Sequence, residues 1–248
     1  MEKSITLDEL SHSLKKMKNN KTPGSDGFPV EFFKVFWNKL IFFVFRSLQE
    51  SYQTSLLPLT MRQCIISCLP KGNKNREYLK NWRPISLLNV TYKLCSSVIA
   101  NRIKEHLDII ISNTQTGFIS NRFIGESTRL VYDLMNICEK KNITGLLMLI
   151  DFEKAFDSVS WRFLMKVLCF FNFGPNIQKW ITLLNSNITA AVQQCGYLSE
   201  FFNIERGCRQ GDPISAYLFI ICAQLLYLMI FNNKDIKGIF IENNDPIC

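Results

Sequence analysis

The sequence predicts an α+β fold in which helices back a small antiparallel sheet. Three observations carry this prediction. Apolar residues recur at helical spacing from the N-terminus onward, two strand-like segments at 64–69 and 82–88 flank a polar loop, and a short apolar run occupies 146–150. With 248 residues, 47% of them hydrophobic and 20% charged, the chain is able to bury a large core, and disorder is not its dominant state.

The helices are predicted from capping signals and from the period of their apolar residues. Thr6 and Glu9 have the spacing of a capping box, which starts a short amphipathic helix. A turn at 22–27 follows, and Pro29 suits the first position of a helix that reaches about residue 53. Further helices are expected at 91–106, through 135–137, at 160–171, through 180–184, and from Pro213 to about 231.

The strands are predicted from β-branched residues, alternation and turn residues. Segments 64–69 and 82–88 enclose a polar loop and predict a hairpin whose tip projects Lys71 and Arg83. Segments 188–194, 201–204 and 236–242 also have the pattern of strands.

The apolar run at 146–150 follows Gly145 and ends abruptly at Asp151, which favours a buried strand with a carboxylate at its exit. Backbone pairing would hold that carboxylate rigidly at the mouth of a cleft, where it reaches a cation or a substrate. The alternative is that an acidic residue here only caps the segment that follows.

The net charge of +8 is concentrated in one part of the chain. Between residues 62 and 104 there is one acid, Glu77, and there are nine basic residues: Arg62, Lys71, Lys74, Arg76, Lys80, Arg83, Lys93, Arg102 and Lys104. Such a block, interrupted by aromatic residues, predicts a polyanion or a triphosphate as partner. A solvated basic face is the alternative.

The nine cysteines and two histidines contain no C-x-x-C pair, which makes a zinc site improbable and favours reduced thiols in an intracellular compartment. The first residues are charged and helical, unlike a secretory signal. The most apolar run, at 216–231, is shorter than the roughly 20 residues that span a bilayer, so we expect a buried helix and no membrane partner.

Several motifs occur in an order that resembles the reverse transcriptase domain of non-LTR (LINE-type) retrotransposons over essentially the whole chain. They are Lys21–Phe28, Glu31–Lys34, Leu69–Lys71, Asn81–Leu88, Gln115–Phe118 with Arg122, Asp151–Asp157, and Arg206–Ser215 with Leu218 and Phe219. The resemblance implies the fingers and part of the palm of a right-hand polymerase, without a thumb. The fingers would span 1–142 and the partial palm 143–248, with a connector at 160–205 that packs partly with the fingers.

The resemblance implies primer extension with deoxynucleoside triphosphates on an RNA template and a DNA primer, in the nucleus and cytoplasm. Two Mg²⁺ ions would be held in part by the Asp151 carboxylate and the Phe152 carbonyl, because two-metal phosphoryl transfer needs clustered oxygen ligands. Phe156 would lie under the sugar and exclude a 2′-hydroxyl. The alternative for that ring is a core aromatic.

The remaining nucleotide-binding residues are also implied by the resemblance. Lys71 and Arg83 would grip the triphosphate, with Lys74 and Arg76 as substitutes. Gln210 and Gly211 would let the backbone approach the new base pair. We expect Arg209 and Asp212, which flank this turn, to fix its shape. Asp26 and Asp157 are likewise expected to stabilise local structure. The hypothesis further expects Asp151, the basic hairpin and the Gln210–Gly211 turn to face one hollow.

The family's aromatic-Ala-Asp-Asp hairpin is absent from the sequence. We therefore expect a partial coding region with negligible polymerase activity, because one carboxylate holds two cations poorly. A non-catalytic nucleic-acid-binding remnant is one alternative. A phosphatase with Asp151 as nucleophile is a distant one, since Glu153 stands where it would need a second aspartate.

Overall fold

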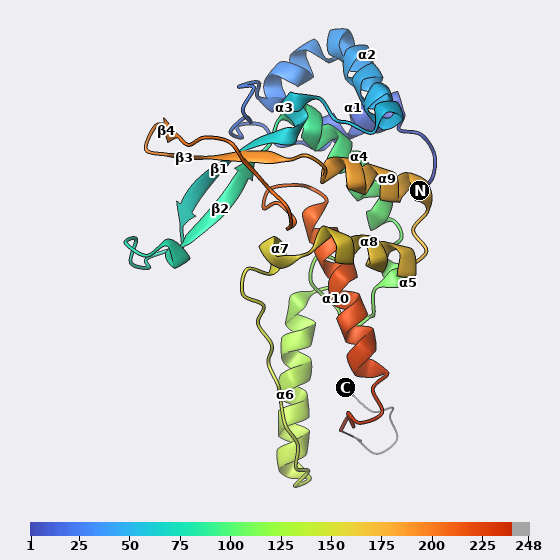
Figure 1. Ribbon diagram of the computed structural model, residues 1–248. Coiled ribbons are helices and arrows are strands. Elements are labelled where there is room, and N and C mark those ends of the chain that lie inside the picture. Colours follow the sequence, from blue (N-terminus) through green and yellow to red (C-terminus); the bar gives the residue numbers. More distant parts are fainter. Residues whose placement is uncertain (240–248) are drawn as a thin grey trace.

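The computed structural model describes residues 1–239 and is a mixed α/β structure (Figure 1). The helices are α1 (Leu7–Lys16), α2 (Val30–Thr54), α3 (Leu59–Arg62), α4 (Val90–Lys104), α5 (Leu107–Ile110), α6 (Ile124–Lys140), α7 (Ala155–Ser158), α8 (Trp161–Phe170), α9 (Pro175–Leu184), α10 (Ser215–Phe231) and the 3₁₀ turn η1 (Leu79–Asn81). The strands are β1 (Gln63–Pro70), β2 (Trp82–Leu87), β3 (Thr189–Gln194), β4 (Tyr197–Leu198) and β5 (Phe202–Asn203).

The sheet confirms the predicted hairpin and corrects the predicted pairing. Within the described residues five strands form one sheet in the order β2-β1-β3-β4, and β5 also pairs with β3. β1 and β2 are antiparallel, as predicted, with Ile66 opposite Ser86. β3, however, runs parallel to β1 with Ala190 opposite Cys64, so the sheet is mixed and not purely antiparallel. The parallel pair joins segments that are far apart in sequence.

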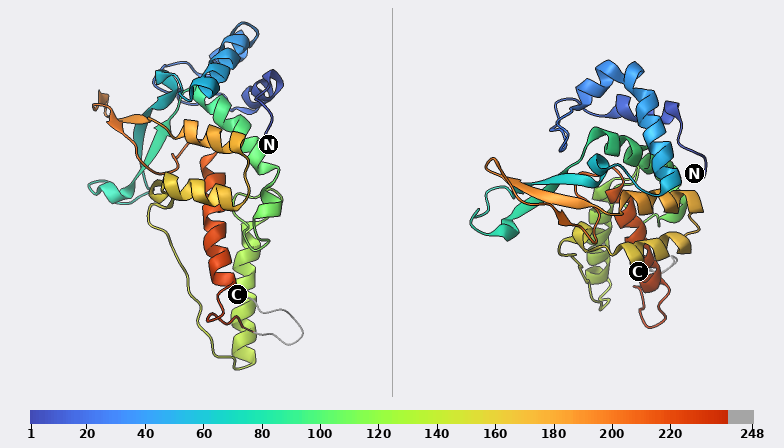
Figure 2. Two further views of the ribbon diagram at one scale, coloured as in Figure 1. Left: turned by 45° about the vertical axis from the view of Figure 1, so that its right-hand side comes forward. Right: turned by 45° about the horizontal axis from the view of Figure 1, so that its top comes forward.

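Helix α4 forms the centre of the core. Ten of its residues are buried, on every side of the helix, because α1, α2, α9 and α10 all contact it. Apolar residues on several faces of α4 are thus enclosed, and its buried polar side chains, such as Arg102, have partners in the surrounding elements. Figures 1 and 2 show the sheet extending to one side of this helical body, while α6 and α10 run away from it.

The N-terminal strap, which we define as Met1–Ile5, ties three helices together. It precedes the predicted capping box, which is present at the start of α1. Arg102 of α4 donates to the backbone carbonyls of Met1, Lys3 and Ser4. The carboxylate of Glu2 accepts the backbone N–H of Asn176 at 2.8 Å in the first turn of α9, where negative charge stabilises a helix. The strap therefore anchors α1 and α9 to the central helix.

One predicted strand is wrong. Residues 143–152 form an irregular segment that leads from the far end of α6 to α7 (Figure 1), and Leu146 and Leu149 are 84% and 82% exposed. A strand needs a pairing partner, and within residues 1–239 none pairs with this run. The predicted strand at 236–242 is not formed by residues 236–238, and its residues from 240 onward lie outside the described part.

Two helix starts also differ from the prediction. Pro29 is the N-cap of α2, and its first helical residue is Val30. Helix α10 begins at Ser215, two residues after Pro213. Both differences are within the usual uncertainty of helix boundaries.

Candidate nucleotide-binding site

The hairpin β1–β2 carries the two predicted phosphate-binding residues. The backbone N–H of Lys71 donates to the carbonyl of Asn81 at 2.8 Å, and its Nζ donates to the carbonyl of Lys80 at 2.8 Å. Arg83 pairs in register with Leu69, and its side chain is exposed. The ammonium group of Lys71 is thus folded back onto the loop, while the guanidinium of Arg83 is free to meet an anion from solvent.

The Gln210–Gly211 turn docks directly onto β2. The backbone N–H of Ser86 donates to the carbonyl of Gln210 at 2.8 Å. Gly211 has φ +107°, and a Cβ at this position would lie 2.8 Å from the carbonyl oxygen of Ser86. Both the backbone conformation and the close approach therefore require glycine here.

The loop before this turn docks onto the segment around α7. The N–H of Cys208 donates to the carbonyl of Phe156 at 2.7 Å, and the N–H of Gly207 donates to the carbonyl of Val159 at 2.8 Å. Gly207 has φ +95°, and a Cβ there would lie 3.0 Å from the carbonyl oxygen of Asp157. These contacts bring the Gln210 turn and the Asp151–Asp157 motif together, although more than fifty positions separate them in the sequence.

A cavity of about 230 Å³ lies where the hairpin, the turn and the Asp151–Asp157 motif meet. Ser86 and Pro84 line it from β2, Gln210 and Arg206 from the loop, and Asp157 from α7. Burial raises the pKa of Asp157, although the positive charge of Lys154 opposes this shift. A small polar ligand in this cavity would thus meet the carboxyl group of Asp157, the guanidinium of Arg206 and the residue Gln210.

The position of Asp157 in this cavity was missed by sequence reasoning, which assigned it to local structure. Its place in the Asp151–Asp157 motif was the available signal. Arg206 was missed as well, although it opens the glycine-rich motif that ends at Ser215. For Asp26 the assignment to local structure is confirmed, since its carboxylate accepts the backbone N–H of Phe28 at 3.1 Å.

Not all predicted residues line the cavity. Asp151 is exposed and is not among the lining residues, because the segment that carries it forms no strand. Strand alternation also places Arg83 on the opposite face of β2 from Pro84 and Ser86. The expected common hollow is therefore not formed by the predicted residues: Gln210 lines this cavity, whereas Asp151, Lys71 and Arg83 do not.

Phe156 belongs to a small aromatic cluster. Its ring stacks on Phe219 of α10 with centroids 5.1 Å apart, and meets Phe118 edge-on at 6.4 Å. Phe152 also contacts Phe219 edge-on at 6.5 Å. The ring of Phe156 thus packs against other aromatic rings, as the alternative of a core aromatic expects. Its backbone carbonyl accepts the N–H of Cys208 and so holds the loop beside the cavity. Its contact with a sugar stays a prediction.

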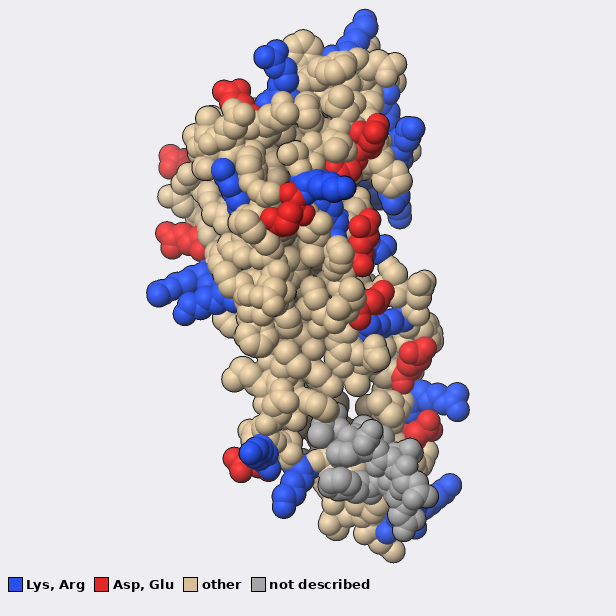
Figure 3. Space-filling model, turned by 90° about the vertical axis from the view of Figure 1, so that its right-hand side faces the viewer, with Lys and Arg blue, Asp and Glu red and all other residues tan. Residues whose placement is uncertain are grey.

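The basic block is divided between the surface and the interior. Arg102 is used internally, in an ion pair with Glu9. Lys93 is more than half buried, and burial lowers its pKa despite the nearby carboxylates of Asp212 and Asp26. Four basic residues of the hairpin and its loop are exposed, namely Lys74, Arg76, Lys80 and Arg83, and Lys71 is half-buried. On the side of the molecule turned away from the hairpin, positive and negative side chains are interspersed and neither sign forms a patch (Figure 3).

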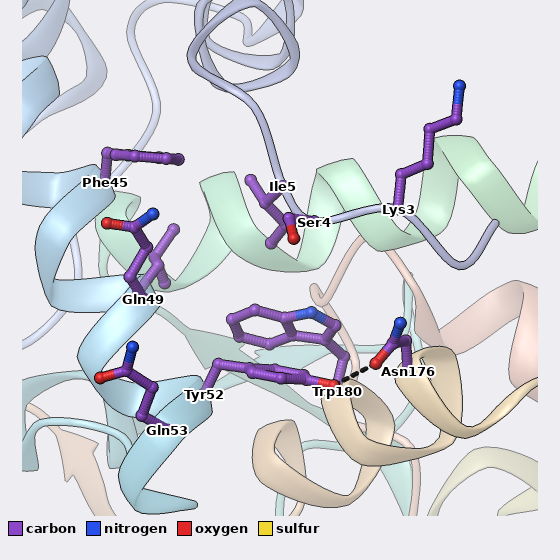
Figure 4. A pocket seen from close by; sticks show the side chains of 10 residues that line it. Lys3, Ser4, Ile5, Phe45, Gln49, Tyr52, Gln53, Asn176 and Trp180 are labelled. Atoms are coloured by element: carbon purple, nitrogen blue, oxygen red, sulfur yellow. Dashed lines mark hydrogen bonds between the residues drawn. The ribbon is translucent and has the colours of Figure 1, made fainter.

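A second, apolar cavity of about 520 Å³ lies between α7, α8 and α10, beside Phe152. Phe163, Leu226 and Met229 contribute to its walls. A third cavity of about 160 Å³ lies under the N-terminal strap, where Tyr52 of α2 and Trp180 of α9 are in contact (Figure 4). Phe152, whose carbonyl was assigned to a metal ion, lines the apolar cavity, and neither cavity is lined by a residue assigned to the nucleotide itself.

The described residues contain neither a cluster of candidate metal ligands nor a helix that could span a membrane. No group of three or more His, Cys, Asp or Glu side chains within residues 1–239 could hold a metal ion. In the same part of the chain, no helix is both long and apolar enough to cross a bilayer. All cysteines up to Cys222 are free thiols.

Comparisons with known proteins agree with the motifs. Residues 69–238 match the family described as "Reverse transcriptase (RNA-dependent DNA polymerase)". The transposon TX1 uncharacterized 149 kDa protein of Xenopus laevis is 33% identical over 99% of this chain and 18% of its own length. The Pol polyprotein of the R1 element of Bradysia coprophila is 24% identical over 91% of the chain and 22% of its own length.

A third relative is the RNA-directed DNA polymerase from the mobile element jockey of Drosophila funebris, 24% identical over 88% of the chain and 24% of its own length. The chain thus spans about a fifth of the length of these relatives. The family match covers more than half of the chain and includes β2, the loop before it, α7 and the Gln210 turn. The chain therefore belongs to the reverse transcriptase (RNA-dependent DNA polymerase) family.

Proposed function

We propose that this reverse transcriptase domain adds deoxynucleotides to a primer 3′-hydroxyl, and that the incoming nucleotide binds against its Gln210–Gly211 turn. The observation that carries the proposal is the docking of the Gln210–Gly211 turn onto β2, at the carbonyl and N–H of Ser86. A rigid turn of this kind presents backbone and amide groups to a base pair without a side chain in the way. The division into fingers at 1–142 and partial palm at 143–248 is part of this proposal.

The basic hairpin supplies the charge for the triphosphate. Arg83 offers a planar fork that matches two phosphate oxygens, and it would bind them on the face of β2 opposite the cavity. Lys71 offers a point charge. Lys74 and Arg76 lie in the exposed loop between the strands and are able to substitute for Lys71, whose Nζ already donates to a carbonyl. The same positive surface would attract the phosphate backbones of an RNA template and a DNA primer.

Phe156 is proposed to select deoxynucleotides. Its backbone is fixed by the hydrogen bond from Cys208, and its ring is held by the stack on Phe219. A ring that cannot move excludes a 2′-hydroxyl by contact, and this discriminates against ribonucleotides without an attractive interaction.

Divalent metal ions serve the reverse transcriptase family, and Mg²⁺ suits the oxygen ligands proposed here, the Asp151 carboxylate and the Phe152 carbonyl. These two groups do not by themselves fit a site for two ions, because the described residues contain no cluster of three candidate ligands. Asp151 is proposed as a catalytic carboxylate that needs further oxygen ligands.

Primer extension by the protein of the complete open reading frame tests the proposal. Asp151→Ala should abolish extension and leave primer–template binding within about twofold of the wild type, since the substitution removes a ligand and not the basic hairpin. Glu50→Ala, which removes an exposed carboxylate on α2, is the matched control and should retain activity. Extension by the Asp151→Ala protein would refute the metal role. Binding without extension by the wild type would favour a non-catalytic nucleic-acid-binding remnant.

A further inference from the structure

Four buried polar side chains behind the Gln210–Gly211 turn form one network. Tyr92 and Ser96 lie on α4, and Arg209 and Asp212 lie on either side of the turn. The hydroxyl of Tyr92 donates to Asp212 Oδ2 at 2.6 Å, and the hydroxyl of Ser96 donates to Asp212 Oδ1. Nη2 of Arg209 donates to the hydroxyl of Tyr92 and, at 3.0 Å, to the carbonyl of Leu184.

This network is buried, and burial strengthens each of its hydrogen bonds. The side chains of Arg209 and Asp212 are 4% and 3% exposed, and Nη2 of Arg209 lies 3.4 Å from Asp212 Oδ2. The guanidinium also lies over the ring of Tyr92, 4.3 Å from its centroid. Burial raises the pKa of Tyr92 well above its usual value, so its hydroxyl stays protonated and remains a donor to Asp212.

The turn is therefore held from two sides. On the cavity side the carbonyl of Gln210 accepts the N–H of Ser86 in β2. On the core side Asp212 and Arg209 connect it to the central helix through Tyr92, which is 1% exposed. Removal of a partner from a buried charged network leaves the remaining groups unsatisfied and free to rearrange.

We propose that Tyr92 is a positioning residue for nucleotide binding: it acts through Asp212 and Arg209 to hold the Gln210–Gly211 turn against β2. This inference rests on the proposed function, in which the turn contacts the incoming nucleotide. Ser96 acts in the same way on the second oxygen of the carboxylate. Neither hydroxyl touches the cavity, so their effect on a ligand has to pass through the turn.

Tyr92→Phe is the principal variant, because it removes one oxygen and keeps the ring under Arg209. Ser96→Ala is the second variant and keeps α4 helical. Tyr52→Phe is the matched control, because it removes a tyrosine hydroxyl that hydrogen-bonds Asn176 beside the cavity under the strap, away from the turn (Figure 4). All three are made in the 248-residue chain.

Two readouts separate the steps of the inference. Hydrogen exchange measures the amides of Ser86 and of residues 205–214, and equilibrium titration measures the affinity for dTTP with Mg²⁺ and for a primer–template duplex. For Tyr92→Phe we expect about tenfold faster exchange at these amides and about tenfold weaker dTTP binding, the effect of one lost hydrogen bond to a charged group. Duplex affinity should stay within about twofold in every variant.

Each outcome decides a separate point. If the Tyr92→Phe and Ser96→Ala proteins show unchanged exchange at the turn, the positioning role is overturned whether or not nucleotide binds. If exchange rises but dTTP affinity does not fall, the turn does not set nucleotide affinity, and the inference is overturned at that step. If the wild-type chain binds the duplex but not dTTP, the proposed nucleotide site fails, and the inference fails with it. A fall in duplex affinity with Tyr92→Phe would indicate a general loss of structure instead of positioning.

Discussion

Replacing Arg102 by methionine tests how strongly one buried guanidinium holds the N-terminal strap to the core. Nε and Nη2 of Arg102 donate to the two carboxylate oxygens of Glu9 at 2.7 and 2.8 Å. The guanidinium also donates to three strap carbonyls, that of Ser4 at 2.8 Å among them. Methionine keeps the apolar stem in place and removes all of these donors.

The magnitude follows from the burial of the partners. Removal of one member of a buried ion pair costs about 3–5 kcal/mol of folding free energy, because the other charge stays without a partner. The side chain of Arg102 is 11% exposed, but that of Glu9 is 33% exposed and gains some solvation when the pair is lost. We therefore expect Arg102→Met to lower the free energy of unfolding by about 2–3 kcal/mol, below the fully buried range.

Urea denaturation followed by far-ultraviolet circular dichroism measures this loss, with Arg129→Met as the matched control. Arg129 pairs with Asp133 on α6 at 3.4 Å, and its side chain is 84% exposed. Such an exposed pair contributes at most about 0.5 kcal/mol. If the two variants lose the same stability, the guanidinium of Arg102 does not hold the strap and the reasoning from burial is wrong.

Three further predictions follow from the contacts above. Gly211→Ala should cost about 1–3 kcal/mol of stability, because the position has φ +107° and the added Cβ would lie 2.8 Å from the carbonyl oxygen of Ser86. In the same denaturation assay Gly72→Ala should cost less, because Gly72 also has a positive φ but its added Cβ would meet no atom within 4 Å. An equal loss of stability in both variants would show that the contact with Ser86 is not the cause. Phe156→Val should admit ribonucleotides in primer extension by the complete open reading frame, and unchanged sugar discrimination would contradict the proposed gate. Burial alone would raise the pKa of Glu9, but the hydrogen bonds it accepts, above all that from Arg102, lower it from 4.5. The resulting stability should be present above pH 4.5 and be lost as the pH falls through the lowered pKa. Arg102→Met should reduce this loss of stability with falling pH, as measured by urea unfolding at a series of acid pH values. An unchanged pH dependence would show that the Glu9–Arg102 pair is not its source.

Local patterns were sufficient for most elements of this fold. The capping box of Thr6 and Glu9 and the hairpin at 64–69 and 82–88 depend on residues close in sequence, and both are present. The strand predicted at 146–150 failed because pairing is a property of two segments, and a single segment carries only half of it. The place of Asp157 in the cavity could not be predicted for a similar reason, since this cavity exists only when a distant loop docks beside it.

By itself the sequence determined the membership of the family, through motifs whose order and residue types are specific, and it determined the helices and the basic hairpin through short-range periodicity and turn residues. Only the tertiary structure decided that β3 pairs in parallel with β1, that Tyr92 lies behind the Gln210–Gly211 turn, and that Asp157 joins that turn in one cavity. The physical reason is that these contacts link residues between about 50 and 130 positions apart. Their existence depends on how the whole core packs, which no local pattern records.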